Sequence, residues 1–225
     1  RSLRVQRHLG TRLRIHRQGN RCAALEVERA GTLRLMGWPA RQLISFERYL
    51  EIEEESTIKH EYLDGTAWAM AGGTFEHSAV TTNIIGLLVV GLRGKGCRPY
   101  ETNMRIRVKA TGLATYPDAS VICGRIQLDP ADPMNTTATN PRVLVEVLSK
   151  STEKYDRGEK LDHYRKIATL KEVVLVSYKQ QLIEVWRKAG HAWKRHEFRE
   201  VAHLTSVGCE LPLSEVYRDL AGAEA

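Results

Sequence analysis

The chain has 225 residues, of which 42% are hydrophobic and 27% are charged, as in a globular protein with one sizeable core. No apolar run approaches the roughly 18 residues needed to span a bilayer, so no membrane partner is expected. The sequence opens on no hydrophobic signal segment. The four cysteines are far apart and form no CxxC pair, which argues against a zinc site and against a disulfide framework. Reduced thiols and a cytoplasmic location are therefore expected.

The net charge of +7 belongs entirely to the first 35 residues. They contain nine arginines, no lysine and two acids, Glu26 and Glu28, so the rest of the chain is neutral. This distribution weakens the case for a basic nucleic-acid-binding face on the folded part. Residues 1–35 show no apolar period and are expected to form a disordered basic extension, with residues 36–225 as a single domain. Two interpretations of the extension stay open: Met36 is the natural start, or the extension is an arm that grips phosphates.

The first elements in chain order are helical, with a hairpin between them. Ser45 is a suitable N-cap for a short amphipathic helix over residues 46–55. The Asp64-Gly65 pair predicts a two-residue turn within a hairpin over residues 60–70, because both turn positions need positive φ. Residues 78–92 carry an apolar stripe at helical spacing that includes Val80, Ile84 and Leu88, and a glycine-rich segment ends this helix.

The second half of the chain alternates strands with one further helix. We expect strands over residues 98–109 and 116–123, then a loop over residues 129–141 that is rich in Pro, Asp, Asn and Thr. Residues 142–148 are apolar on both faces, which is typical of a central, covered strand. A charged helix follows over residues 155–167, and strands follow over residues 172–178, 182–187 and 193–198. This order predicts an α/β fold with a mixed sheet flanked by helices.

Glu146 is the one carboxylate in the apolar strand, and burying it ionised costs several kcal/mol unless something compensates its charge. A metal ion, a basic partner or protonation would do so. Asp118 follows Pro117, which interrupts hydrogen bonding along a strand, so Asp118 should lie at a sheet margin. Two acids on neighbouring strands can bind Mg²⁺ or Mn²⁺ through their oxygens. The structural alternatives are a paired core acid at Glu146 and a turn-forming residue at Asp118.

An ordered series of motifs resembles a known family of nucleases. The matching segments are Glu61-Tyr62-Leu63-Asp64-Gly65, His77 at the start of the long helix, Tyr116-Pro117-Asp118, Glu146-Val147-Leu148-Ser149 with Ser151-Thr152, and Tyr155-Asp156-Arg157-Gly158-Glu159-Lys160 with Tyr164. Over residues 44–220 the chain resembles the Uma-type family of restriction endonucleases, within the PD-(D/E)xK nucleases. The resemblance implies a restriction-endonuclease-like mixed sheet between helices, with an N-terminal helix and hairpin, and Asp118 and Glu146 as metal ligands.

One position departs from the usual nuclease pattern. A lysine normally stands two residues after the second acid, and this chain has Leu148 there. We expect Lys160 to replace that lysine, because Asp156, Lys160 and Tyr164 are spaced four apart and share a helix face. Lys150 is nearer in sequence, but it stands where the family commonly has proline. The alternative for Lys160 is an exposed pair with Asp156, worth a few tenths of a kcal/mol.

Further candidates each have a structural alternative. Glu61 is the third acid that we expect to assist catalysis, unless it is a cross-strand ion-pair partner. His77 could polarise a water or bind phosphate, or it could face solvent in the first turn of its helix. Arg105 and Arg107 alternate along one strand face, which favours a solvated face over phosphate contacts.

The predicted activity is hydrolysis of DNA phosphodiesters by a metal-activated water, with Mg²⁺ or Mn²⁺ on Asp118 and Glu146 and with Lys160 orienting the water or stabilising the developing charge. A homodimer would suit double-strand cleavage, although no residue indicates one. The first alternative is a nucleic-acid-binding or regulatory module with a degenerate site. The second is a structural protein in which Glu146 is a satisfied core acid.

Overall fold

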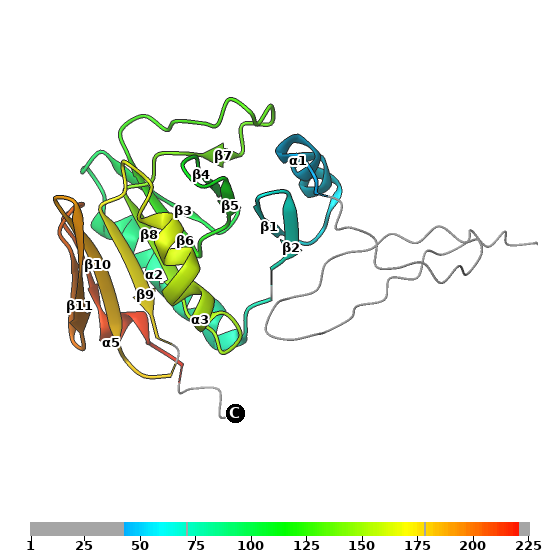
Figure 1. Ribbon diagram of the computed structural model, residues 1–225. Helices are drawn as coiled ribbons and strands as arrows, with labels where there is room; N and C mark the ends of the chain where they lie inside the picture. Colours follow the sequence, from blue (N-terminus) through cyan, green and yellow to red (C-terminus); the bar gives the residue numbers. More distant parts are fainter. Residues whose placement is uncertain (1–42, 71, 178, 221–225) are drawn as a thin grey trace, which may run out of the picture.

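The computed structural model describes residues 43–70, 72–177 and 179–220, so the basic extension and Met36 lie outside the described residues. Its largest element is a six-stranded sheet in the order β11-β10-β9-β8-β6-β3 (Figure 1). The strands are β3 (Cys97–Glu101), β6 (Ala119–Cys123), β8 (Val143–Val147), β9 (Glu172–Val176), β10 (Ile183–Ala189) and β11 (Ala192–Phe198). Only the β8–β9 pair is parallel among them, so the sheet is mixed.

Strand β8 is buried along its whole length, as its apolar sequence predicts. Because successive side chains point to opposite faces, β8 contributes to two cores. Val143, Val145 and Val147 pack with helix α2 (Phe75–Gly91) on one face. Leu144 and Leu148 belong to the core on the other face, where the yellow-green helix runs in front of the sheet (Figure 1).

That helix is continuous in its course but changes type. It begins as α3 (Glu153–Tyr155), continues as a π-helical turn η1 (Asp156–Lys160), and ends as α4 (Leu161–Tyr164). The sequence predicts a helix over residues 155–167. In the structure this helix begins two residues earlier, at Glu153, and ends three residues earlier, at Tyr164. π-helical turns are rare and are often associated with functional sites.

A smaller five-stranded sheet lies beside the first, in the order β2-β1-β5-β4-β7. Helix α1 (Phe46–Glu55) packs on it, and Ser45 caps the helix as predicted by accepting a hydrogen bond from the Arg48 amide. Asp64 and Gly65 have φ of 47° and 81°, which confirms the predicted hairpin turn. The strands are β1 (His60–Leu63), β2 (Thr66–Ala69), β4 (Arg105–Val108), β5 (Leu113–Thr115) and β7 (Thr137–Ala138).

The expected strand over residues 98–109 was wrong. The chain forms β3, turns where the Met104 amide donates to the Glu101 carbonyl at 3.0 Å, and continues as β4 in the other sheet. This turn has no glycine or proline signal, so the alternating pattern hides it. The sequence also does not predict β5, β7 or the C-terminal elements β12 (Val201–Leu204), β13 (Cys209–Pro212) and α5 (Leu213–Val216), which join the α2 core.

The expectation of reduced cysteines was also wrong for one pair. Cys97 and Cys123 lie directly opposite each other on β3 and β6 and form a disulfide. Their separation of 26 residues conceals this pairing, because only the strand register brings them together. Among the described residues Cys209 is a free, buried thiol. The prediction of a cytoplasmic location therefore loses the support that it took from reduced cysteines. In a separate respect, no helix in the described part is long and apolar enough to cross a bilayer.

The close packing of α2 on β13 gives a test with a control in the same helix. A Cβ added at Gly91 would lie 2.5 Å from the Cys209 Sγ, whereas one at Gly86 would meet nothing within 4 Å. We expect Gly91→Ala to lower the free energy of unfolding by about 1–3 kcal/mol through overpacking. Gly86→Ala should raise it by up to about 1 kcal/mol through helix propensity. Urea denaturation measures both changes.

The overpacking explanation has a second requirement. In a Cys209→Ala background the nearest remaining atom is the residue 209 Cβ, at an ordinary contact distance of 3.7 Å. The cost of Gly91→Ala should therefore nearly disappear in that background. An equal loss of unfolding free energy in both backgrounds would show that residue 91 must be glycine for its backbone conformation, and not because Cys209 lies close to it.

Candidate active site

Glu146 lies on β8 between Leu144 and Leu148, on the face that the helix of residues 153–164 covers. Only 4% of the residue is exposed. Burial raises the pKa of Glu146 well above its ordinary value of 4.5, the charge of Lys160 opposes this rise, and the nearby carboxylates of Asp156 and Asp118 add to it. The strand thus holds a carboxylate that needs positive charge.

Asp118 lies immediately before β6, at the margin that Pro117 predicts. Because Ala119 pairs with Val145 in the antiparallel β6–β8 register, Asp118 comes beside Glu146. Its Oδ2 accepts a hydrogen bond of 2.7 Å from the Val147 amide, which fixes the carboxylate against β8. The side chain is 17% exposed, so this acid forms part of the open edge of the cluster.

Lys160 comes from the π-helical turn and is almost completely buried. Its Nζ lies 3.0 Å from Glu146 Oε1, 3.0 Å from Glu61 Oε1 and 3.6 Å from Asp156 Oδ1. Burial alone would lower the pKa of Lys160, but the Glu146 and Glu61 carboxylates outweigh it and raise this pKa. The ammonium therefore stays charged. The alternative of an exposed Asp156–Lys160 pair is wrong, and Lys150 is itself exposed.

Glu61 reaches the cluster from the smaller sheet. It lies on β1 opposite Trp68, is 4% exposed, and accepts a hydrogen bond from the Thr115 hydroxyl on β5. Its ion-pair partner is Lys160 rather than a residue across its own sheet. The structure thus brings together all four residues that the sequence selects, Asp118, Glu146, Lys160 and Glu61, where the two sheets meet.

His77 lies in the first turn of α2 at the exposed edge of the cluster. Its Nε2 is 3.3 Å from Asp118 Oδ2, and this hydrogen bond raises the pKa of His77. A Cβ on Gly73 would lie 2.9 Å from His77 Nδ1, so the glycine leaves room for the ring in this position. The alternative of a solvent-facing histidine does not hold, since the side chain is 19% exposed and faces Asp118.

Three further side chains complete the surroundings of the site. Asp156 is 4% exposed, and burial raises its pKa. The Tyr164 hydroxyl donates to Glu146 Oε1, and Thr115 contacts Glu61 as described. The sequence places Asp156 and Tyr164 on the face of Lys160 but gives them no role. For Thr115 it offers no signal, because the residue lies on a short strand that the sequence does not reveal.

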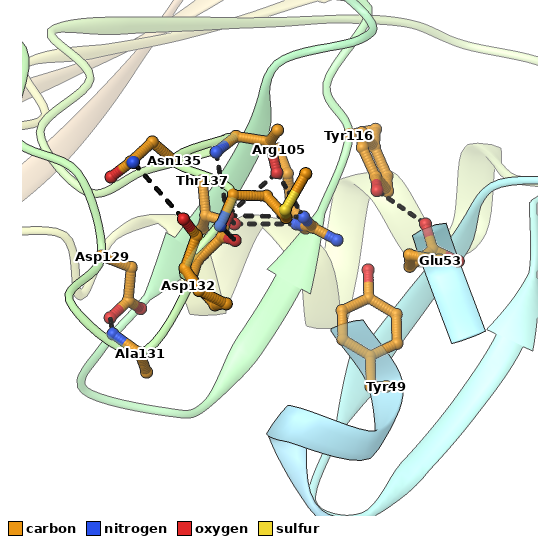
Figure 2. Close-up of polar contacts among 12 residues, drawn as sticks. Tyr49, Glu53, Arg105, Tyr116, Asp129, Ala131, Asp132, Asn135 and Thr137 are labelled. Carbon is orange, nitrogen blue, oxygen red and sulfur yellow. Dashed lines mark hydrogen bonds and ion pairs between the residues drawn. The ribbon is translucent and has the colours of Figure 1, made fainter. Parts of the chain in front are cut away.

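Arg105 and Arg107 do not lie on a solvated face, so that expectation was wrong. Arg105 is 5% exposed and donates to the Thr137 and Thr136 hydroxyls at 2.8 and 2.6 Å. Figure 2 shows it between the loop that carries Asp132 and the rings of Tyr49 and Tyr116. The Arg107 guanidinium carbon lies 3.6 Å from the centre of the Phe46 ring. Both arginines anchor α1 and the loop to β4.

Residues 46–215 match the model of a protein family named Uma2, which is described as "Putative restriction endonuclease". The chain belongs to the Uma2 family. Two proteins of Synechocystis sp. are similar to it. One, slr1290, is 35% identical over 182 residues, which cover 79% of this chain and 93% of the relative. The other, sll1609, is 28% identical over 149 residues, which cover 66% and 83%.

A solved structure shares the fold. It is a crystal structure from Anabaena variabilis, described as "a putative nuclease belonging to DUF820". Its TM-score is 0.59 at 18% identity, and the match covers 72% of this chain and 92% of that chain. The prediction of a nuclease-type α/β fold with mixed sheets between helices is confirmed. The Uma2 match also confirms the family that the sequence motifs resemble.

The donor set of this Uma2 protein fits a hard divalent cation. Within the described residues, all hydrogen bonds and ion pairs of Asp118 go to Oδ2 and those of Glu146 go to Oε1. One oxygen of each carboxylate is thus left for a ligand. No three histidine, cysteine or acidic side chains in the described ranges form a ready-made metal cage. Two carboxylates with water and phosphate in the other positions suit Mg²⁺ or Mn²⁺.

The charge balance of the cluster predicts that a loss of Glu146 is tolerated. In metal-free buffer at neutral pH we expect Glu146→Gln to leave the free energy of unfolding unchanged or to raise it, because the amide carries no charge that must be buried. Ionising this buried acid costs stability, because its folded pKa is raised. The gain should vanish below pH 4.5, where wild-type Glu146 is protonated in both states. A clear loss in urea denaturation at pH 7 would indicate a purely structural acid.

Removal of Lys160 should have the opposite sign. Lys160→Met leaves Glu61 and Glu146 buried without their cation, so we expect a loss of about 3–5 kcal/mol in the same denaturation experiment. Lys150→Met is the control, since Lys150 is exposed and should change stability by less than about 0.5 kcal/mol. A loss similar to that of the control would mean that the buried carboxylates are protonated and need no ammonium.

Proposed function

We propose that this protein is a divalent-metal-dependent endodeoxyribonuclease that hydrolyses phosphodiester bonds. The observation that carries the proposal is the convergence of Asp118 and Glu146 from adjacent strands beside a buried, charged lysine. The description of the Uma2 family as a restriction endonuclease supports DNA as the substrate. The partly open edge at Asp118 and His77 is where a phosphate would enter.

Asp118 and Glu146 would hold the cation, Mg²⁺ or Mn²⁺, through the oxygens that the protein leaves unbonded. When bound, such a cation activates water and neutralises charge on the phosphate. The protein's own groups do the positioning. The Val147 amide and His77 fix Asp118, and Glu61 fixes Lys160.

Lys160 would act as a charged donor and not as a general base. Its raised pKa keeps the ammonium protonated at neutral pH, so it has no free electron pair to accept a proton. A fixed positive charge beside the reacting phosphate stabilises the negative charge that develops there. It is one of the two roles that the sequence predicts for Lys160.

The competing proposal is a nucleic-acid-binding or regulatory module with a degenerate site. The neutral composition of residues 36–225 supports it, since a DNA-cleaving surface usually carries an excess of basic residues. Both proposals require the same fold, and turnover distinguishes them.

The test is a calorimetric titration of Mn²⁺ into wild type and Asp118→Ala, with the same samples incubated with supercoiled and single-stranded DNA. We expect wild type to bind and cleave, and Asp118→Ala to do neither. Asp162→Ala is the matched control, because its side chain is 70% exposed on the helix of Lys160 and its one ion pair among the described residues is with Arg165. It should behave as wild type.

Binding of Mn²⁺ without cleavage of either DNA would favour the regulatory module. The absence of Mn²⁺ binding by wild type would remove the metal site and the nuclease proposal together. Equal cleavage by wild type and Asp118→Ala would point to a contaminating nuclease.

A further inference from the structure

Tyr164 is a buried tyrosine whose ring packs in the apolar core and whose hydroxyl contacts the carboxylate cluster. The residue is 1% exposed, and its ring belongs to the core that Leu144, Leu148 and Leu161 help to form. A phenylalanine would fill the same space there. The hydroxyl is therefore the part of the side chain that packing does not explain.

The hydroxyl donates to Oε1 of Glu146, the same oxygen that lies 3.0 Å from Lys160 Nζ. Two donors from one helix thus converge on one oxygen of a carboxylate that belongs to the neighbouring strand. Glu146 Oε2 has no hydrogen bond or ion pair to any residue of the described ranges. A carboxylate held at one oxygen cannot rotate about its terminal torsion without losing both contacts.

The Tyr164 hydroxyl is the donor in this bond, because an ionised carboxylate can only accept. Lys160 ends the π-helical turn and Tyr164 ends α4, four residues later, so both side chains reach Glu146 from one face of the helix.

We propose that Tyr164 is a positioning residue that, together with Lys160, occupies one oxygen of Glu146 and so directs the other oxygen toward the catalytic cation. The inference rests on the proposed metal-dependent function and adds to it a residue outside the metal ligands. Groups that orient metal ligands commonly change metal affinity by 10–100-fold when they are removed, because the ligand must then be ordered upon binding.

The first experiment compares Mn²⁺ affinity by calorimetry in wild type, Tyr164→Phe and Tyr217→Phe. Tyr217 is the matched control, because it is also buried and its hydroxyl bonds the backbone of Ser177 and Leu182, with no contact to the carboxylate cluster. We expect Tyr164→Phe to weaken Mn²⁺ binding at least about 10-fold and Tyr217→Phe to leave it unchanged.

The kinetic experiment measures the DNA cleavage rate as a function of Mn²⁺ concentration, which separates the Mn²⁺ concentration needed for half-maximal rate from the maximal rate itself. For Tyr164→Phe the DNA cleavage rate should recover when Mn²⁺ is raised to saturation, because the ligands themselves remain. A fall in the rate at saturating Mn²⁺ with unchanged metal affinity would overturn the positioning role.

The other outcomes separate the inference from the function on which it rests. Wild-type binding with equal affinity in Tyr164→Phe would overturn the inference and leave the nuclease proposal intact. Equal weakening in both tyrosine variants would also overturn it, since a general loss of stability would then explain the effect. Failure of wild type to bind Mn²⁺ would overturn the proposed function first, and the inference with it.

A second measurement covers the case in which Tyr164→Phe does not fold. 3-Fluorotyrosine placed at position 164 alone keeps the hydroxyl and gives a fluorine NMR signal next to the carboxylate. We expect Mg²⁺ to shift this signal in a saturable way, while the same label at position 217 does not respond. An unchanged signal at position 164, under conditions where calorimetry shows Mg²⁺ binding, would overturn the inference.

Discussion

The ammonium of Lys160 joins three separate parts of the fold in one place. It contacts Glu61 on β1 of the smaller sheet, Glu146 on β8 of the larger sheet, and Asp156 on its own helix. A cation in a medium of low dielectric interacts strongly with carboxylates, and each of these acids would be costly to bury without it. The position of the helix and the approach of the two sheets therefore depend on a charge that must be paired.

The need to pair this charge explains why the cluster is buried and yet carries an excess of negative charge. The cluster holds four acids, Glu61, Asp118, Glu146 and Asp156, and one lysine, so the negative charges outnumber the positive charges even when His77 is protonated. Burial is the main cause of the raised pKa values of Glu146 and Asp156, and the neighbouring carboxylates add to it. A divalent cation would remove the excess, which is why a site with only two available carboxylates still suits one.

The sequence singles out the two acids because each violates a local rule. Glu146 is a carboxylate in a strand that is apolar on both faces, and Asp118 follows a proline that ends strand pairing. The selection of Lys160 depends on helical spacing and on the family resemblance, and the distances are consistent with it. The errors arise where the sequence carries no local signal: the turn between β3 and β4, the Cys97–Cys123 disulfide and the burial of Arg105.

The sequence by itself determined the main helices, the hairpin turn, the covered central strand and the acids that need a cation, because periodicity, turn chemistry and the cost of a buried charge are local properties. The tertiary structure alone decided that residues 97–108 divide between two sheets, that Glu61 and Glu146 share one lysine, and that Tyr164 bonds Glu146 Oε1. These facts depend on strand register and on how the helix of residues 153–164 meets the two sheets. Both are set by the packing of segments far apart in the chain, which no local pattern encodes.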